Sequence, residues 1–554
     1  MYYKQFCTIV TKISSKIEVV GNYIDNQLIG NIHPFLPEYK SWGINEIEKF
    51  KKNISKNPTE FLKNFVADFS FVYFSEDNKI IAARDHFGIF PLYYYNDENQ
   101  LIISNDQRLI TSLPNLDLTP DSDWMGDYVT QSNAHTCLTF YKNIKKLLPA
   151  HLLEYRDGVI NINKYWELNL SNPLPKKTDE EYIEEFKQLL QQAVESRIPE
   201  EGNVGSEVSG GIDCTSIAAI AKSYLDKQNR PLYTYAHAAV DAENNDSEKV
   251  PITKFVEFLK PYKHTFIPDK IKGMRHVVEH AIKLGNGISQ SHYAMFSKEI
   301  YEKAQADDVK IIFSGNGGDH GVSYKGSFAI IGAHISDGRY NKALKELKII
   351  NNSRIRTIYS FIKNFIFIKF NIGSNKVLNK EKDKSKVDFI YEFTKAYPIL
   401  KEYKYKPTFN SSKFKYSNHI IADKLLNSDI SKRGESTTIA ASNFGVIYRY
   451  PLLDIRLLQY FMSLPPHMLY QDGVNRYIFR KTIENWVPKT VAYQPKPPAN
   501  MYGWIMEAYK YDFENKLEYN LVPENEEMKF CLDYWKIRDE GTYKGEKLRK
   551  TITL

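Results

Sequence analysis

Two glycine-rich turns, each directly after an apolar strand-like stretch, constrain the fold of this chain most strongly. The first reads Ser209-Gly-Gly-Ile-Asp213 and the second Ser314-Gly-Asn-Gly-Gly-Asp319. Glycines let backbone N–H groups approach phosphate oxygens, and the N-terminus of a following helix favours the same anion. No Lys follows the first turn as in G-x-x-x-x-G-K-[ST], which disfavours a γ-phosphate-transferring P-loop. The pattern favours a pyrophosphate site, with cleavage between the α- and β-phosphates of ATP, over a simple tight turn.

The two turns are expected to meet in the folded chain. Ligands of an open parallel sheet lie beyond the carboxyl ends of its strands, so turns on neighbouring strands would bring Asp213 and Asp319 to one place. Two carboxylates there predict a Mg2+ site for a nucleotide triphosphate. The residues expected to bind ATP are Val208, Ser209, Gly210, Gly211, Asp213, Cys214, Thr215, Gly315 and Gly317.

The pattern of the chain changes near residue 170. Alternating apolar residues with closely spaced turns predict a mostly β domain over residues 1–170. Residues 171–554 instead alternate strands with helices, beginning with a helical pattern at Asp179, which is typical of a doubly wound parallel sheet. The pattern is lost over residues 324–418, which we interpret as a helical insertion with a mobile loop. The strands expected in the sheet are 203–208, 232–236, 263–267 and 310–313.

Composition excludes several classes of function. The 554 residues are 42% hydrophobic, enough for two cores, and a net charge of +7 is too small for a nucleic-acid footprint. The four cysteines are scattered without a C-x-x-C pair, and the histidines form no H-E-x-x-H motif, which disfavours a disulfide framework or a zinc site. Because the N-terminus also lacks a secretion-signal pattern, we expect a cytoplasmic protein without a nucleic-acid partner.

The stretch that comes nearest to a membrane span is Thr357–Ile372, which Lys363 and Lys369 interrupt. It is too short and too charged to cross a bilayer. We interpret it as a packed helix or hairpin of the insertion rather than as a membrane-surface patch, so no membrane partner is expected.

Further motifs resemble one enzyme family. Arg449-Tyr-Pro-Leu-Leu-Asp454 is followed by Leu464-Pro-Pro466, Arg476-Tyr-Ile-Phe-Arg-Lys481 and Val491-Ala-Tyr-Gln-Pro-Lys496. With the two turns, these runs within residues 203–504 resemble in order and spacing the synthetase domain of asparagine synthetase and its relatives, beta-lactam synthetase and lasso peptide cyclase. The resemblance implies an adenine nucleotide alpha-hydrolase-like domain that uses ATP and Mg2+ and forms AMP.

The front of the chain resembles the glutaminase domain of the same family, which has an Ntn-type fold. Asp68–Phe74 and Arg84–Tyr94 match the strands at the end of that domain. The catalytic residues are missing, because position 2 is Tyr2 and Cys7 lies inside the chain, without the free α-amine that serves such a nucleophile as base. The first Arg is Arg84, so no earlier guanidinium can bind the glutamine carboxylate. Residues 1–170 are therefore predicted to be a degenerate glutaminase-like domain that makes no ammonia.

The resemblance also implies catalytic roles. Lys496 matches the loop lysine of the family and is expected to neutralise charge on the departing pyrophosphate. Asp319 joins Asp213 in holding Mg2+, and either His320 or Glu435 is a candidate to take the proton from the attacking amine.

The acceptor is expected to differ from free aspartate. Asn316 and Ile447 stand where asparagine synthetase has carboxylates, whereas the sequence around His320 and Glu207 is closer to lasso peptide cyclases. In those enzymes the amino terminus of a peptide captures its own activated side-chain carboxylate, which implies a precursor peptide, a leader peptidase and a leader-binding protein. Two alternatives stay open: a synthetase that forms an amide or lactam on a small molecule, and a nonenzymatic nucleotide-binding protein.

Overall fold

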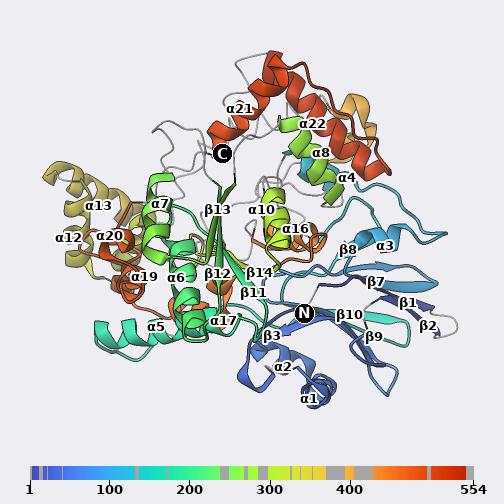
Figure 1. Cartoon of the computed structure of the whole chain (residues 1–554), viewed down its shortest axis with the longest axis horizontal. Helices are drawn as coiled ribbons and strands as arrows, with labels where there is room; N and C mark the ends of the chain where they lie inside the picture. Colours follow the sequence, from blue (N-terminus) through green and yellow to red (C-terminus); the bar gives the residue numbers. More distant parts are fainter. Residues whose placement is uncertain are drawn as a thin grey trace.

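The computed structural model of the chain has a β-rich front domain and an α/β rear domain, which pack against each other (Figure 1). No helix among the described residues is both long enough and apolar enough to cross a membrane. The structure describes residues 3–11, 16–21, 23–39, 42–130, 137–170, 174–237, 249–267, 273–284, 297–324, 327–336, 338–351, 353–369, 393–404, 425, 430–495 and 501–544.

The front domain consists of two antiparallel sheets that face each other across a core containing Phe6, Val72 and Leu101. Alternating apolar residues produce this arrangement, because successive side chains of a strand point to opposite faces. The mostly β character predicted for this region is confirmed. The strands of the first sheet are, in order, β2 (Lys16–Gly21), β1 (Phe6–Thr11), β7 (Gln100–Ser104), β6 (Tyr93–Asn96) and β8 (Ile144–Lys146). Those of the second are β10 (Val159–Lys164), β9 (His151–Arg156), β5 (Ile80–Arg84), β4 (Ala67–Phe74) and β3 (Leu28–Pro34).

The short helices of the front domain lie at the edges of these sheets. Phe50 of α1 (Ile44–Lys56) packs against Phe71 of β4 with their ring centroids 5.2 Å apart, so α1 covers part of the outer face of the second sheet. The front-domain helices are η1 (Pro37–Tyr39), α1 (Ile44–Lys56), α2 (Pro58–Asn64), α3 (Gln107–Thr111) and α4 (Ser122–Thr130).

The rear domain is built on a sheet whose described strands are all parallel, which confirms the predicted doubly wound fold. Helices α6 and α7 lie on one side of this sheet and α10 and α16 on the other (Figure 1). The strands are, in order, β13 (Lys263–Ile267), β12 (Leu232–His237), β11 (Asn203–Glu207), β14 (Val309–Phe313) and β15 (Ile447–Arg449). The helices are α5 (Asp179–Glu195), α6 (Ile212–Asp226), α7 (Lys249–Leu259), α10 (Lys298–Ala306), α16 (Ile430–Ser442) and α17 (Ile455–Met462).

The strand order places a topological switch point between β11 and β14. The chain runs from β11 to β12 and β13 on one side, then crosses to β14 on the other side of β11. Neighbouring loops diverge at such a point, which leaves a crevice beyond the strand ends. Both glycine-rich turns lie there, because one follows β11 and the other follows β14.

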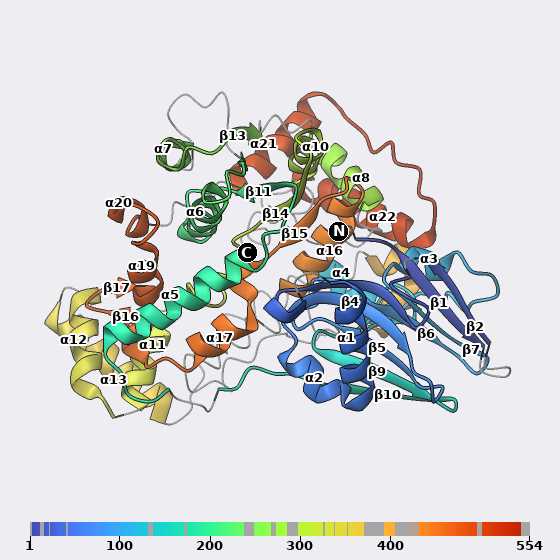
Figure 2. The same ribbon diagram turned by 60° about the horizontal axis from the view of Figure 1, so that its bottom comes forward.

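The insertion forms a helical layer at the edge of the rear domain that is remote from the front sheets (Figure 2). Its described parts are helical, as predicted, while the basic run 379–386 lies outside the described residues. The helices of this layer are α11 (Ser327–Ser336), α12 (Tyr340–Asn351) and α13 (Arg354–Lys369), and the segments beside it are α18 (Pro466–Leu469), β16 (Tyr470–Gln471), β17 (Val474–Asn475), α19 (Tyr477–Ile483) and α20 (Lys489–Ala492). Two short helices lie elsewhere: η2 (Pro398–Glu402) packs against α4 of the front domain, and η4 (Pro451–Leu453) packs against α5 and α17.

A second core joins the C-terminal helices to the front domain. Phe530 packs against Trp124 and Phe140 of the front domain, and Met274 lies in the same cluster. This core therefore holds the C-terminal helices against the front domain. The helices involved are α8 (Met274–Leu284), α21 (Met501–Glu514) and α22 (Glu526–Lys544).

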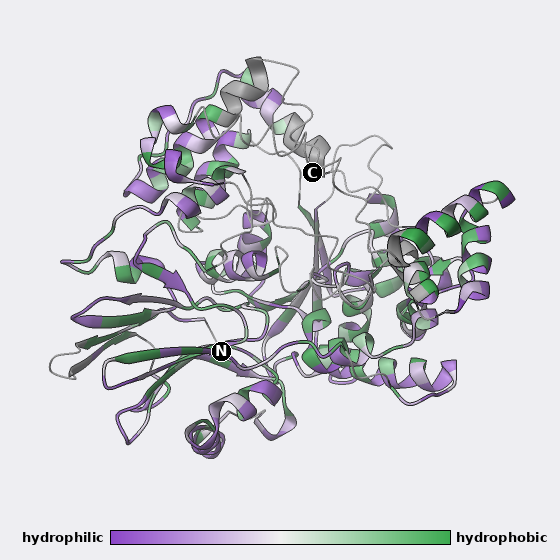
Figure 3. Ribbon diagram, turned by 180° about the vertical axis from the view of Figure 1, so that it is seen from behind, coloured by the Kyte–Doolittle hydropathy of each residue, from purple (hydrophilic) through white to green (hydrophobic). Residues whose placement is uncertain are grey.

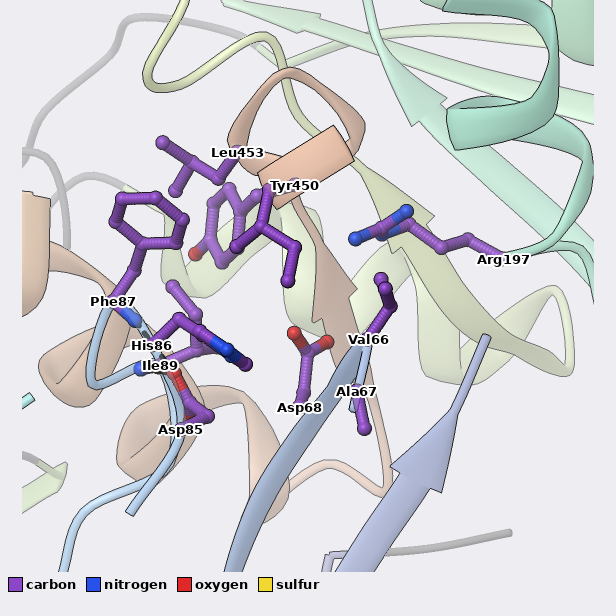
Figure 4. A pocket seen from close by; sticks show the side chains of 11 residues that line it. Val66, Ala67, Asp68, Asp85, His86, Phe87, Ile89, Arg197, Tyr450 and Leu453 are labelled. Carbon is purple, nitrogen blue, oxygen red and sulfur yellow. Dashed lines mark hydrogen bonds between the residues drawn. The ribbon is translucent and has the colours of Figure 1, made fainter. Parts of the chain in front are cut away.

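Buried ion pairs lie at the domain interface near η4. Nη1 of Arg449 donates across the interface to Asp68 of the front domain at 2.8 Å, and within the rear domain Nη1 of Arg197 donates to Asp454 at 2.6 Å. Figure 4 shows Asp68 and Arg197 on the wall of a small cavity between the domains. The cavity volume is about 10 Å3, close to the smallest space that holds one water molecule. This part of the interface is thus packed and polar rather than an open channel.

Candidate active site

The first turn connects β11 to the N-terminus of α6. Val208 N–H donates to Tyr235 O at 2.8 Å, which fixes the turn to the neighbouring strand. Gly211 is the N-cap residue of α6, and the Thr215 hydroxyl donates back to its carbonyl at 3.0 Å. The first N–H groups of α6 have no partner within the helix, and its dipole is positive at this end. The sequence prediction of a helix N-terminus at the first turn is confirmed.

Space is left free in front of Gly211. A Cβ added there would meet only Ser209 Oγ at 3.5 Å, an ordinary contact, and the φ of Gly211 is −96°, which any residue adopts. Neither packing nor backbone conformation therefore requires glycine at this position. A glycine that the fold does not need, at the N-cap of a helix, leaves room for the close approach of a phosphate.

The glycines of the second turn are required by packing. A Cβ on Gly315 would lie 2.7 Å from Cys214 N, and one on Gly318 would lie 2.7 Å from Cγ of Asp213. Gly317 has a φ of +91°, in the left-handed region that favours glycine. The two turns are thus pressed against each other, backbone to backbone.

Asp213 and Asp319 lie together, as the sequence predicts, and one guanidinium connects them. Nη1 of Arg476 is 3.7 Å from Oδ2 of Asp213, and Nη2 of Arg476 forms an ion pair with Oδ1 of Asp319. The Arg476 side chain is 3% exposed, that of Asp213 12% and that of Asp319 35%. The pair is therefore open to solvent mainly on the Asp319 side.

The role of Arg476 was not foreseen from the sequence. It stands at the N-cap of α19 with a left-handed φ of 57°. Arg480, four residues later, donates to Asn475 O at 3.0 Å and is 7% exposed. Arg476 begins the Arg476–Lys481 run that resembles the family motif, and this was the available signal.

The donor set fits Mg2+. This cation prefers carboxylate oxygens and is usually held by one or two carboxylates together with substrate phosphates rather than by a full protein cage. Asp213 and Asp319 supply two carboxylates at the turn, and no group of three or more His, Cys, Asp or Glu side chains suited to a metal occurs in the described part of the chain. A Mg2+ ion would share these carboxylates with Arg476 or displace its guanidinium.

A second polar group lies on the same sheet edge, around Glu207 at the end of β11. The hydroxyl of Ser314 donates to Glu207 Oε2 at 2.6 Å, and the phenol of Tyr448 donates to Oε1 at 3.1 Å. Burial raises the pKa of Tyr448 well above its usual value, so the phenol keeps its proton. Arg433 of α16 donates to Asn316 Oδ1 at 3.3 Å beside this group. Three adjacent strands thus present polar side chains next to the two turns.

Lys496 lies outside the described residues, and the chain that leads to it is held at the first turn. Gln494 Nε2 donates to Gly210 O at 2.8 Å. Arg480 Nη1 donates to the carbonyl of Gln494 at 3.3 Å and also to that of Ala492. The segment that ends two residues before Lys496 is therefore fixed against the predicted pyrophosphate turn.

Cys214 and His320 occupy the positions expected for them beside the turns. Burial raises the pKa of the Cys214 thiol to about 12, which leaves it neutral and unsuited to nucleophilic attack. His320 follows Asp319 directly and is half-buried. Its proposed part in proton removal stays a prediction.

Glu435 does not fit the role of general base, and the structure corrects this expectation. Its carboxylate binds Arg84 at 3.0 Å, Lys146 at 2.8 Å and the phenol of Tyr93 at 2.5 Å, all in the front domain. Burial raises the pKa of Glu435, but Lys146 and Arg84 outweigh that effect and hold it at about 2. Residues two apart on a helix point to different sides, so Glu435 faces away from the side on which Arg433 contacts the second turn.

Cys7 of the front domain is unsuited to act as a nucleophile. This cysteine lies inside strand β1, paired with β2 and β7 on either side. Burial raises the pKa of its thiol to about 12. Arg84 is 1% exposed and donates to the carbonyls of Phe90 and Leu147, so it supports the fold rather than facing a substrate.

A doubly wound sheet with a glycine turn, a helix N-terminus and two carboxylates at its switch point is the arrangement in which α/β proteins bind ligands beyond the strand ends. The asparagine synthase family matches residues 185–552, and a glutamine amidotransferase domain matches residues 48–166. Because the first match covers more than half of the sequence, the chain belongs to the asparagine synthase family.

The similar proteins are distant relatives. Asparagine synthetase 3 of Bacillus subtilis (strain 168), described as glutamine-hydrolyzing, is 28% identical over 183 residues, which cover 32% of this chain and 29% of that enzyme. Amidase chry2 of Gibberella zeae is 30% identical over 177 residues, 31% of this chain and 26% of that protein. Glutamine-hydrolyzing asparagine synthetase 2 of the same Bacillus strain is 21% identical over 474 residues, 79% of this chain and 56% of that enzyme. The matched part thus spans less than two thirds of each relative.

Proposed function

We propose that the protein is an ATP-dependent, AMP-forming amide synthetase. The observation that carries this proposal is the meeting of the two turns at the switch point, with Asp213 and Asp319 on one guanidinium and free space in front of Gly211. Backbone N–H groups at the start of α6 bind the pyrophosphate portion of ATP, since they lack partners within the helix. Family membership supports ATP-dependent amide formation in general terms.

The reaction proceeds in two steps. A substrate carboxylate oxygen attacks the α-phosphorus of ATP and the bond to pyrophosphate breaks, which gives an acyl-adenylate. An amine nitrogen then attacks the acyl carbon, the bond to AMP breaks, and the amine loses a proton. Mg2+, when bound at Asp213 and Asp319, supplies charge neutralisation for the phosphates.

The residues of the chain stabilise the charge that develops on the leaving pyrophosphate. Arg476 is already within 3.7 Å of Asp213 at the first turn, and Lys496 follows a segment fixed to Gly210. Preorganised cations at a developing charge act without further reorganisation, which is the main source of such catalysis. His320, directly after Asp319, is our candidate to receive the proton of the amine.

The amine comes from the substrate rather than from glutamine. The Cys7 thiol is neutral and lies within a paired strand, and Arg84 is used by carbonyls of its own domain. Asn316 and Ile447 also replace two carboxylates expected for an aspartate-amidating enzyme. We therefore propose that a peptide side-chain carboxylate is joined to the amino terminus of the same peptide in a lasso-type macrolactam, with a leader peptidase and a leader-binding protein as partners. Joining two small molecules or closing a small lactam is the alternative.

The test is incubation of the full chain with Mg-ATP and candidate precursor peptides, with pyrophosphate release and peptide mass as readouts. Release that depends on the peptide, together with loss of one water from its mass, supports the proposal. Release that depends on aspartate and glutamine would instead make the protein an ordinary asparagine synthetase. Binding of ATP without release under any condition would favour the nonenzymatic alternative.

Asp213→Ala tests the site assignment in this assay. Its side chain lies where the two turns meet, so its loss should weaken ATP binding while unfolding changes little. Unchanged ATP binding by this variant would contradict the site assignment.

A further inference from the structure

Helix α13 carries an apolar stripe on its outward side. The exposed fractions are 82% for Ile355, 56% for Ile358, 67% for Tyr359, 51% for Ile362 and 40% for Ile366. At 3.6 residues per turn these five side chains fall within an arc of roughly 100°, so they form one continuous stripe along the helix. Figure 2 shows α13 at the outer edge of the molecule, beside α12.

The fold packs the face of this helix that adjoins the stripe. Phe361 and Phe365 pack against Tyr340 of α12 and against a small core that contains Ile331 and Leu347. The sequence favoured a packed helix or hairpin here over a membrane-surface patch, whereas the structure packs one side of α13 and leaves the Ile355–Ile366 stripe facing outward. Figure 3 shows hydrophobic and hydrophilic residues alternating along these outermost helices. Exposed apolar area of this extent marks a binding surface more often than a bare monomer surface.

The stripe lies in the most basic part of the described rear domain. Residues 339–369 contain eight Lys and Arg residues and one acidic residue, Glu346, whereas the whole chain of 554 residues has a net charge of only +7. Glu346 is buried and accepts from the backbone N–H groups of Asp472 and Gly473 at 3.0 and 3.2 Å. The outward charge of this layer is therefore positive, apart from Asp472, which pairs with Lys345 at 2.6 Å.

The cations border the stripe. On the helical wheel of α13, Arg356 and Lys363 lie next to one edge of the apolar arc and Arg354 lies next to the other. All three are exposed. Long basic side chains beside an apolar stripe can extend to a charged layer while the apolar residues enter a less polar one.

We propose that α13 docks on the surface of an anionic lipid membrane. A bilayer with anionic head groups is recognised by positive charge and apolar insertion alone, and both are present along the same helix. A protein partner is less well matched, because protein interfaces achieve register and specificity by combining charges of both signs. The proposal concerns a surface remote from the two turns and does not depend on the proposed enzymatic function.

The test is co-sedimentation of the full chain with vesicles of phosphatidylcholine, with or without phosphatidylglycerol. We expect binding to the mixed vesicles that is roughly tenfold or more tighter than to the neutral ones and that weakens at high salt. Ile358→Asn with Ile362→Asn should reduce binding roughly tenfold or more, and so should Arg354→Gln with Arg356→Gln. Ile44→Asn with Val522→Asn is the matched control, because these residues are 81% and 79% exposed elsewhere, and it should leave binding unchanged.

Several results would overturn the proposal. Equal binding to neutral and anionic vesicles, no binding to either, or full binding by the Ile358 and Ile362 variant would each do so. Two experiments without lipid test whether something else occupies the stripe: sedimentation velocity tests for a second copy of the chain, and thiol labelling tests for another part of the same chain. Self-association that the same variant abolishes would identify a second copy of the chain as the partner, and protection of a cysteine at Ile358→Cys from thiol reagents in the monomer would show that the chain itself covers the stripe.

Discussion

Two groups of charged side chains in this molecule differ in how completely they are enclosed. At the domain interface, the pairs Arg84–Glu435, Arg197–Asp454 and Arg449–Asp68 have side chains only 1–11% exposed. At the sheet edge, Arg476 is equally buried, but Asp319 is 35% exposed. In each interface pair both side chains are buried, so these pairs stabilise the fold. The partly open carboxylate identifies the group that a ligand can reach.

The strongest test of this contrast is Asp319→Ala. We expect the rate of ATP-dependent pyrophosphate release to fall about a thousandfold, because one of the two convergent carboxylates is lost. The midpoint of thermal unfolding should stay close to that of the wild type. Asp472→Ala, which removes a carboxylate that is 56% exposed, is the control and should retain activity. Retained activity in Asp319→Ala, or unfolding at much lower temperature, would remove the distinction between the two groups.

The corresponding change at the interface is Asp68→Ala. It leaves the guanidinium of Arg449 buried without its carboxylate, so we expect the free energy of unfolding to fall by about 3 kcal/mol. Urea denaturation measures this loss. Asp226→Ala is the control, because Asp226 forms an exposed pair with Lys222 and its removal should cost less than about 0.5 kcal/mol. Equal effects of the two substitutions would mean that burial does not separate structural from exposed pairs here.

The pH dependence of stability provides a third test, at Glu435. Because its pKa of about 2 in the folded protein lies below the value of 4.5 for a free side chain, its stabilising contribution is complete above pH 4.5 and is lost as the pH falls towards 2. The shift corresponds to roughly 3 kcal/mol. Urea midpoints between pH 2 and pH 4.5 should therefore vary less for Glu435→Gln than for the wild type. Glu180→Gln, at an exposed site, should follow the wild type, and a Glu435→Gln profile that also does so would contradict the interface role.

The fold of the rear domain could be predicted because its signals are local. Strands 203–208 and 310–313 end in glycine turns, and the parallel-sheet rule then brings Asp213 and Asp319 together. β15 was missed as a strand, since it has only three residues, Ile447–Arg449, and no periodicity can be read from so short a run.

What could not be predicted depends on contacts between distant segments. Arg476 reaches Asp213 only because α19 packs on α5, which in turn packs on α6, and Glu435 turns towards Arg84 only because the domains meet on that side of α16. The sequence predicted a packed helix or hairpin over Thr357–Ile372, but not which side of α13 would pack against α12. Local pattern thus identified the turns, and tertiary packing decided which charges surround them.

The glycines of the two turns extend the contrast between open and closed surroundings to the backbone. Gly211→Ala places a methyl group in free space beside Ser209, so stability should change little while the affinity for ATP falls severalfold. Gly318→Ala places the methyl group 2.7 Å from Cγ of Asp213, so the free energy of unfolding should fall by about 1–2 kcal/mol whether or not ATP is present. Urea denaturation and ATP titration of both variants separate these effects. If Gly211→Ala instead lost stability and bound ATP normally, the space in front of Gly211 would belong to the fold and not to the nucleotide.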